Sequence, residues 1–226
     1  MELAIDTSTE IATIALSHCG QVEAEMSWPS GQNHTVELVP GLLYLLQQAK
    51  KSLHQLDAII VAKGPGSFNG LRVGVGTAKG LAYALGIPIV GIGTLEVEAF
   101  QHAPTGLPIC PLQDAARGEL ATALYQLQGG EWRRLIEEHI TTVEGLCPKI
   151  GHRTLFCGRI PPHVAQELEE RLGERALILN TTLRRAGFLA ELGWRRLEKG
   201  DVDHPATLQP LYLRRPAVTI KRATKR

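Results

Sequence analysis

The sequence predicts an α/β protein built on parallel strands, with a second, smaller α/β unit after the first. Once an opening hairpin has passed, short apolar strands alternate with longer stretches of helical periodicity. This alternation is typical of a parallel sheet with helices on its faces. A Pro- and Gly-rich joint over residues 104–108 interrupts the pattern. We therefore expect two domains, residues 1–104 and residues 105–226.

The first domain is predicted to open with a three-strand hairpin structure and to continue with alternating helices and strands. Helical spacing of apolar residues over 33–51 predicts an amphipathic helix, in which Pro40 suits only the first turn or a kink. Alternating or continuous apolar runs predict the strands. These strands are expected at residues 3–5, 11–17, 21–28, 58–62 and 87–92.

A glycine-rich segment, Gly64 to Gly80, follows the fourth of these strands and is the most unusual part of the chain. Gly-Pro-Gly-Ser predicts a tight turn, after which Ser67 or Asn69 caps a helix. Each interior glycine of that helix costs about 1 kcal/mol relative to alanine. We expect its own sheet, a partner helix or a ligand to approach the bare face closely and offset this cost. The spacing matches neither a P-loop nor the dinucleotide fingerprint.

The second domain has less regular patterning than the first. Its predicted strands lie around residues 109–112, 120–128, 132–139, 154–157 and 176–179. Its predicted helices cover residues 161–172 and 181–199. The chain has no low-complexity segment and no short-period repeat.

Composition places the chain among soluble globular proteins. Of its 226 residues, 44% are hydrophobic and 21% are charged. The sequence shows neither a long apolar run nor a basic-then-apolar leader, so we expect a cytoplasmic protein without membrane contact. The four cysteines are scattered without a Cys-x-x-Cys pair, which predicts neither a zinc site nor a disulfide framework.

Positive charge is concentrated at the end of the chain. The last thirteen residues hold six lysines and arginines and no acid. Such a tail contacts nucleic acid in some proteins and is a solvated end in many others, and the sequence leaves both interpretations open.

Four segments resemble the TsaB (YeaZ-like) family. They are Leu-Ala-Ile-Asp-Thr-Ser-Thr at 3–9, the glycine-rich segment 64–80, Asp-Ala-Ala-Arg-Gly-Glu at 114–119 and Gln-Pro-Leu-Tyr-Leu-Arg at 209–214. Members of this family are noncatalytic, degenerate relatives of TsaD, a kinase-like subunit of the bacterial machine that makes threonylcarbamoyladenosine beside the tRNA anticodon. The resemblance spans nearly the whole chain, in order.

The resemblance implies a two-lobed fold of the actin, Hsp70 and sugar-kinase (ASKHA) type, in which each lobe is a mixed sheet with flanking helices. In the family, the helix after the first hairpin and the glycine-rich helix pack against the same helices of TsaD or of a second copy. The positions that this implies as partner interface are His34, Leu38, Leu42, Leu45, Gly70, Leu71, Val73, Gly74, Thr77 and Gly80. The alternative is that several of them face the core of the chain itself.

The same resemblance points to two further groups of residues. The turn Asp6, Thr7, Ser8 and Thr9 stands where kinase-like relatives bind Mg²⁺ and phosphate, and is interpreted as a vestigial nucleotide site. Asp114, Arg117 and Glu119 are contacts expected in the assembled complex, although Ala116 replaces the arginine usual in the family. Where TsaD-type members carry a His-x-x-x-His metal pair, this chain has Thr94 and Glu98, so we expect no metal site and no catalytic residue.

The function predicted from this resemblance is that of a noncatalytic scaffold for a TsaD-like catalytic subunit. The complex would also include a TsaE-like ATPase, and this chain would meet tRNA only indirectly. Without its partner the chain would be a homodimer. We expect no cofactor on this chain alone, and ATP with Mg²⁺ in the partner complex. Two alternatives are an autonomous ASKHA-type ATP-binding phosphotransferase and, less favoured, a glycoprotease-like hydrolase, because Ser67 lacks the Gly-x-Ser-x-Gly spacing.

Overall fold

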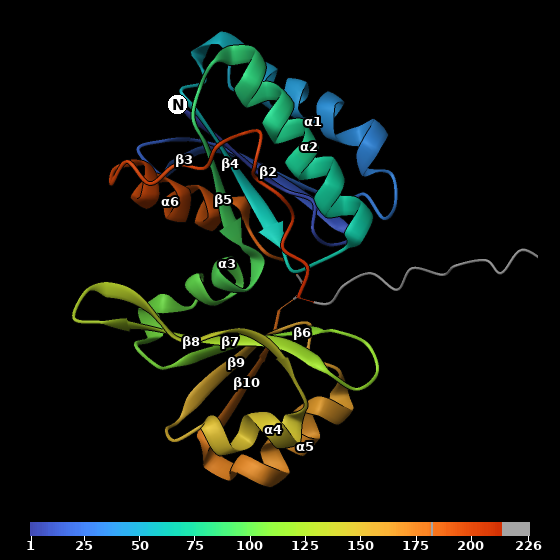
Figure 1. Cartoon of the computed structure of the whole chain (residues 1–226), viewed down its shortest axis with the longest axis vertical. Helices are drawn as coiled ribbons and strands as arrows, with labels where there is room; N and C mark the ends of the chain where they lie inside the picture. Colours follow the sequence, from blue (N-terminus) through green and yellow to red (C-terminus); the bar gives the residue numbers. More distant parts are fainter. Residues whose placement is uncertain (182, 214–226) are drawn as a thin grey trace, which may run out of the picture.

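The computed structural model describes residues 1–181 and 183–213 and folds them into two lobes, each built on one five-stranded mixed sheet (Figure 1). In the first lobe the strand order is β3-β2-β1-β4-β5. The first three strands pair antiparallel, whereas β1, β4 and β5 run parallel. The strands are β1 (Glu2–Asp6), β2 (Ile11–His18), β3 (Gln21–Pro29), β4 (Ala58–Gly64) and β5 (Ile89–Gly93).

Strand alternation divides the first lobe into two apolar layers. Leu3 and Ile5 of β1 point to one face of the sheet, where α1 (His34–Gln48) and α2 (Phe68–Leu85) cover them. Ala4 points to the opposite face, which is covered by α3 (Thr94–Phe100) and α6 (Ala186–Leu197). The sheet is therefore buried on both sides, as parallel strands require.

The second sheet repeats the topology of the first. Its order is β10-β9-β6-β7-β8, with β6, β7 and β8 antiparallel and β6, β9 and β10 parallel. Its strands and helices are β6 (Ile109–Asp114), β7 (Leu120–Gln128), β8 (Glu131–Thr141), α4 (Val143–Leu146), β9 (Thr154–Gly158), α5 (Pro162–Leu172) and β10 (Ala176–Asn180). Short 3₁₀ turns occur at Leu53–Gln55, Ala103–Thr105, Cys147–Lys149 and Gly173–Arg175.

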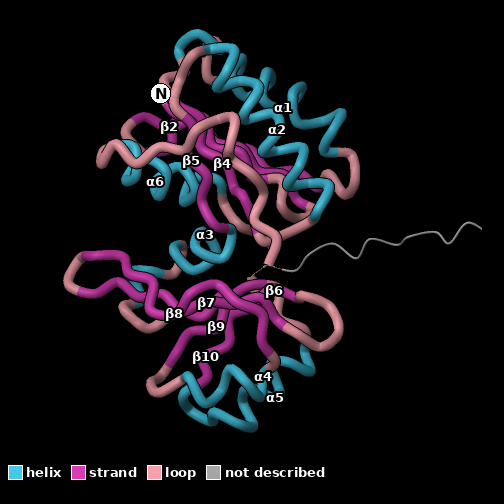
Figure 2. Tube along the Cα trace, viewed as in Figure 1, coloured by secondary structure: helices cyan, strands magenta, loops and turns pink. Residues whose placement is uncertain are grey.

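Helix α3 lies between the two sheets (Figure 2). Its Val97 and Phe100 belong to the core against the first sheet, whereas Leu95 and Ala99 pack against β6, β7 and β9 of the second. Helices α4 and α5 cover the outer face of the second sheet. The order of layers is thus α1 and α2, sheet, α3 and α6, sheet, α4 and α5.

The predicted strands and helices are present, and the structure adds α3 and α4, which the sequence did not predict. Three further points concern Pro40 and α6. Pro40 lies inside α1, which continues past it to Gln48. The helix predicted over 181–199 begins only at Ala186. All strands of the first sheet precede residue 104 and all strands of the second follow it, but α6 does not stay with the second sheet, to whose domain the prediction assigned it.

Helix α6 returns to the first lobe because that sheet has an apolar face to cover. Its Ala186, Leu189 and Ala190 are fully buried against Ala4, Ala15 and neighbouring strand residues. The segment after it stays on the same lobe, where the backbone N–H of Leu211 donates to the carbonyl of Lys63. The basic tail discussed above lies outside the described residues. Within the described residues no helix is both long and apolar enough to span a bilayer.

The glycines of α2 fall into two groups with different surroundings. Ser67 caps the helix, its Oγ accepting the backbone N–H of Gly70 at 3.3 Å. A Cβ atom at Gly70 would lie 2.0 Å from the carbonyl oxygen of Thr7, and one at Gly74 would lie 2.3 Å from the Thr7 Oγ1. Cβ atoms at Gly76 and Gly80 would meet no atom of the described residues within 4 Å. Packing against Thr7 therefore requires glycine at positions 70 and 74, whereas packing within the chain does not require it at positions 76 and 80.

This difference yields a matched pair of substitutions. Gly76→Ala should raise the free energy of unfolding by up to about 1 kcal/mol, because alanine is the better helix former and has room there. Gly70→Ala should lower it by about 2 kcal/mol or more, since Cβ would overlap a backbone oxygen that cannot rotate away. Urea denaturation of both variants measures the two shifts, and equal effects at the two positions would contradict this packing.

Candidate functional site

A cleft opens between the lobes where the strands β1, β6, β9 and β10 end. It encloses about 480 Å³. One wall comes from the turn after β1 and the start of α2, and the other from the second sheet. Its lining residues are Thr9, Glu10, Ile11, Ser67, Leu95, Glu98, Leu112, Gln113, Asp114, Gly158, Arg159, Thr181 and Arg184. In open α/β sheets such a position, at the carboxyl ends of the strands, is where ligands bind.

The turn after β1 is held by its own hydrogen bonds and by α2. The Asp6 Oδ1 accepts the backbone N–H of Ser8 at 2.8 Å and its hydroxyl at 2.6 Å. The Thr7 hydroxyl donates to the carbonyl of Gly70 at 2.7 Å. The His34 Nε2 donates to the carbonyl of Thr9 at 2.9 Å. Asp6, Thr7 and Ser8 are buried, so only Thr9 of the predicted nucleotide turn reaches the cleft surface.

Arg184, from the segment before α6, fills the place beside Asp6. Its Nε donates to the Asp6 Oδ2 at 2.7 Å, and its guanidinium also donates to the Ser8 hydroxyl. On its other side the Arg184 Nη1 lies 3.6 Å from the Glu98 Oε2 of α3. Arg184 and both carboxylates are at most 8% exposed. One guanidinium therefore joins the turn after β1 to the helix between the sheets.

The ion pair decides the charge state of Asp6. Burial raises the pKa of this carboxyl, but the positive charge of Arg184 and the hydrogen bonds from Arg184 and Ser8 outweigh burial, so the pKa lies below its ordinary value of 3.8. Asp6 is consequently an ionised acceptor whose two oxygens are taken by groups of this chain. A Mg²⁺–phosphate group at Asp6 would have to displace Arg184.

Most of the positions implied as partner interface lie inside the chain. Seven of them are buried in its own core or against the turn after β1, and cannot contact a partner in this structure: His34, Leu38, Leu42, Leu45, Gly70, Leu71 and Gly74. The helical periodicity does identify a buried stripe, and this stripe is the one that faces the chain's own sheet. Val73 and Thr77 are half-buried, and Gly80 is exposed.

The three residues expected to act in the complex lie on the turn between β6 and β7. The Asp114 Oδ1 accepts the backbone N–H of Ala116 at 2.9 Å, and Asp114 lines the cleft. Arg117 is exposed at the tip, where Ala116 and Arg117 adopt positive φ angles of 62° and 60°. The turn thus places Asp114 at the cleft and Arg117 on the surface. The backbone carbonyl of Glu119 accepts the N–H of Ala115, which closes the turn.

Sequence reasoning missed Arg184 as the partner of Asp6. Two arginines precede α6, and no local pattern distinguishes them. Arg184 is buried, whereas its neighbour Arg185 is exposed and pairs with the partly buried Glu25. The contact between Arg184 and Asp6 joins residues 178 positions apart, so no spacing rule finds it.

The duplicated sheet topology and the cleft between the lobes define a two-lobed protein of the actin and sugar-kinase class. The ROK hexokinase of Thermus thermophilus has the same fold, with a TM-score of 0.50 over 88% of this chain and 99% of that one at 12% identity. The fold prediction is confirmed by these features.

Relatives with higher sequence identity identify the family. The model of TsaD, described as tRNA N6-adenosine threonylcarbamoyltransferase, matches residues 29–174. The tRNA threonylcarbamoyladenosine biosynthesis protein TsaB of Bacillus subtilis is 34% identical over 94% of this chain and 93% of its own length. A Pseudomonas aeruginosa structure described as similar to peptidase YeaZ has a TM-score of 0.82 at 28% identity, covering 94% of this chain and 99% of that one. The chain belongs to the TsaB (YeaZ-like) family of tRNA threonylcarbamoyladenosine biosynthesis proteins, within the set that the TsaD model describes.

The buried ion pair generates a prediction about stability. Arg184→Met should lower the free energy of unfolding at pH 7 by about 3–5 kcal/mol, because it leaves two carboxylates buried without their cation. Arg185→Met is the matched control, and should cost about 1 kcal/mol or less because the Arg185 guanidinium is exposed and Glu25 keeps the backbone N–H of Gly187 as a donor. Urea denaturation measures both, and similar losses in the two variants would refute the role assigned to Arg184.

The same pair predicts how stability depends on pH. Because the folded state lowers the pKa of Asp6, its contribution is complete above the ordinary value of 3.8 and is lost as the pH falls through the lower folded pKa. In Arg184→Met, burial is the largest effect on Asp6 and is opposed only by the hydrogen bonds from Ser8, so the folded pKa of Asp6 should rise. The stability gap between the wild type and Arg184→Met should therefore shrink as the pH is lowered from 7 to 4. A gap that stays constant over this range would contradict the assignment.

Proposed function

We propose that the chain is a noncatalytic subunit that binds a TsaD-like catalytic partner and supports its threonylcarbamoyl transfer to adenosine in tRNA. Membership of the TsaB family supports a role in threonylcarbamoyladenosine biosynthesis. The outer face of α1 and α2 supports binding to a partner as the way in which the chain acts. This face, called here the α1–α2 face, consists of Val36, Val39, Leu43, Tyr44, Val73, Gly76, Thr77, Gly80, Tyr83 and Ala84.

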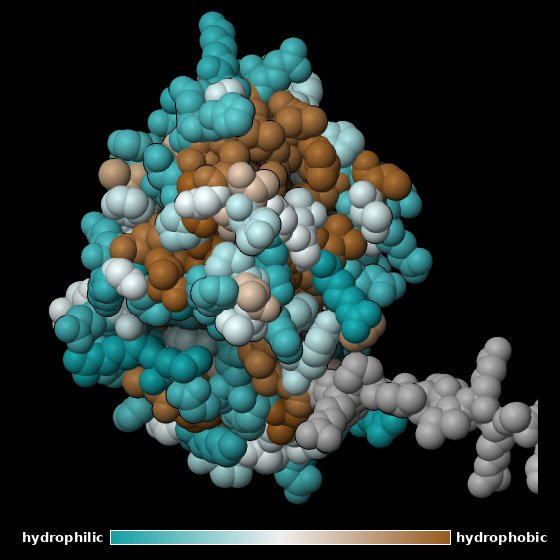
Figure 3. Space-filling view, turned by 45° about the horizontal axis from the view of Figure 1, so that its top comes forward, coloured by the Kyte–Doolittle hydropathy of each residue, from teal (hydrophilic) through white to brown (hydrophobic). Residues whose placement is uncertain are grey.

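The α1–α2 face is apolar although it meets solvent in this chain. Val36 is 69% exposed and Tyr83 is 85% exposed, and Leu43 and Tyr44 are each about half exposed. Figure 3 shows apolar side chains gathered on the first lobe. Large exposed apolar groups that share one face mark an interaction surface more often than a solvated one.

On each helix, the spacing of these residues places them on one side of that helix. Val36, Val39 and Leu43 recur at intervals of three and four residues on α1, which places them on one side of that helix. On α2 the same side carries Gly76 and Gly80, where no side chain rises above the backbone. A partner helix can therefore approach α2 closely, and larger side chains around it supply apolar contact. The proposal rests on this pairing of side-chain-free backbone at Gly76 and Gly80 with exposed apolar side chains around it.

We assign the same face to a second copy of the chain when no partner is present. The homodimer and the complex would then exclude each other, because both bury the same residues. A TsaE-like ATPase would join the assembled complex, and tRNA would meet this chain only indirectly. Nucleotide and Mg²⁺ would be bound in the partner complex, since Arg184 neutralises Asp6 here.

The two alternative functions fit the cleft less well. A phosphotransferase would need Asp6 for Mg²⁺, and both of its oxygens accept hydrogen bonds from Arg184 or Ser8. A hydrolase would need Ser67 as a nucleophile, and its Oγ caps α2 instead. Neither alternative uses the α1–α2 face.

A substitution on the exposed face tests the proposal. Gly80→Arg has room in the monomer, so it should leave the free energy of unfolding nearly unchanged while weakening binding to the TsaD-like subunit of the same organism at least tenfold. Calorimetric titration measures the affinity. Glu169→Arg, at a position on α5 that is also exposed, is the control and should bind as the wild type does. Unchanged binding of a folded Gly80→Arg would refute the proposed interface.

The same variants separate the interface from the pathway. In cells depleted of the native protein, Glu169→Arg should restore threonylcarbamoyladenosine in tRNA, and Gly80→Arg should not, as measured by mass spectrometry of tRNA nucleosides. Normal levels of the nucleoside after depletion alone would contradict the pathway itself.

A further inference from the structure

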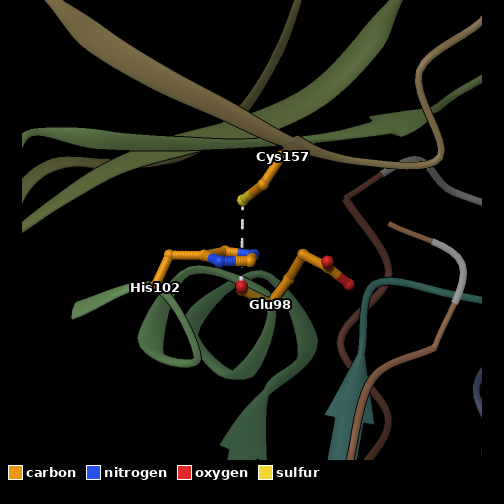
Figure 4. Close-up of side chains that lie close together, drawn as sticks. All are labelled: Glu98, His102 and Cys157. Atoms are coloured by element: carbon orange, nitrogen blue, oxygen red, sulfur yellow. Dashed lines mark hydrogen bonds between the residues drawn. The ribbon is translucent and has the colours of Figure 1, made fainter. Parts of the chain in front are cut away.

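Three side chains with metal-binding atoms converge beside the cleft (Figure 4). Glu98 belongs to α3, His102 lies in the turn after it, and Cys157 comes from β9 of the second sheet. One carboxylate oxygen, one imidazole nitrogen and the thiol sulfur all lie within 4.8 Å of one another. Glu98 and Cys157 are buried and His102 is half-buried. The sequence predicts no metal site, because its cysteines are scattered and Thr94 and Glu98 stand where the family's histidine pair is expected.

The hydrogen bonds of this cluster are incomplete. The Nε2 atom of His102 is buried and has no hydrogen-bond partner among the described residues. A buried polar atom without a partner costs about 1–3 kcal/mol. Within residues 1–181 and 183–213, the Cys157 thiol makes one long hydrogen bond, 3.8 Å, to the backbone carbonyl of Glu98. Both atoms are ones that a metal ion would use.

Glu98 retains room for a further ligand. Its Oε1 accepts from Gln101 at 3.0 Å and from Thr181 at 2.5 Å, and its Oε2 faces Arg184 at 3.6 Å. A carboxylate offers about four lone-pair sites. Gln101, Thr181 and Arg184 use three of them among the described residues, so one site on Oε2 is left.

The buried charges beside this cluster sum to a net negative charge, which a bound cation would neutralise. Asp6 and Glu98 supply two buried negative charges, and Arg184 supplies one positive charge. Buried charge is stable when it is paired or coordinates a metal. A divalent cation that replaced the proton of the Cys157 thiol would add two positive charges and one negative charge. The network would then be neutral.

We propose that Glu98, His102 and Cys157 form a zinc site that ties α3 to the second sheet. Sulfur, nitrogen and oxygen are the donors that Zn²⁺ takes in proteins, at about 2.0–2.3 Å. A tetrahedral ion with such bonds sets its ligand atoms about 3.5 Å apart, so separations that reach up to 4.8 Å here would shorten by at most about 1.3 Å through side-chain rotation. Three protein ligands leave the fourth position to water. The site does not depend on the proposed partner interface.

Cobalt(II) is the probe that tests this site in the purified full chain after treatment with a chelator. We expect one Co²⁺ per chain, with a thiolate-to-cobalt charge-transfer band and the visible bands of a tetrahedral ion, and we expect Zn²⁺ to abolish both. Cys157→Ala should lose the charge-transfer band. His102→Gln should weaken Co²⁺ binding more than about 100-fold, beyond the loss typical of an outer-shell partner.

Cys110→Ala is the matched control, because Cys110 is equally buried on the neighbouring strand β6 and packs on the other face of the sheet. It should keep the band and the affinity. Zn²⁺ should also raise the unfolding temperature of the wild type and of Cys110→Ala but not of His102→Gln, which provides a second readout if Cys157→Ala does not fold. Absence of the charge-transfer band in the wild type, or its persistence in folded Cys157→Ala, would overturn the proposal.

Discussion

The buried ion pair between Arg184 and Asp6 is the interaction on which the arrangement of the cleft depends. It joins the turn after the first strand to the segment before the last helix, and through Glu98 it reaches the helix between the two sheets. A buried pair of this kind adds little net stability compared with apolar packing, but removing one partner is costly. Its main effect is therefore to specify one arrangement of three segments that are distant in the chain. The same contact takes up the carboxylate that a kinase-like relative would offer to a metal ion.

The close approach of the turn after β1 to helix α2 is the second constraint. Thr7 packs so near to α2 that a Cβ atom at Gly70 or Gly74 would overlap its atoms, and its hydroxyl satisfies the carbonyl of Gly70. These two glycines are consequently fixed by the monomer. Gly76 and Gly80, on the outer side of the same helix, are free of that demand, and they are the glycines for which a partner helix offers a physical reason.

Helix α3 connects the two copies of one sheet topology. It belongs to the core of the first lobe through Val97 and Phe100 and to that of the second through Leu95 and Ala99. Because α3 packs in both cores, it holds the two lobes in one relative position. For this reason the polar groups at its end, Glu98 and His102, lie where the cleft, the buried ion pair and the proposed zinc site meet.

The sequence by itself determined the local elements of this protein. Alternation and helical periodicity are properties of neighbouring residues, so the strands, α1, α2 and the cap at Ser67 could be predicted, and four quoted segments were sufficient to indicate the family. Only the tertiary structure decided which stripe of each helix faces inward, which sheet α6 covers, and which arginine meets Asp6. Two faces of one helix can both be apolar or both be glycine-rich, and periodicity does not state which of them has a neighbour. A contact between residues 178 positions apart is created by the fold, and no local pattern in the chain encodes it.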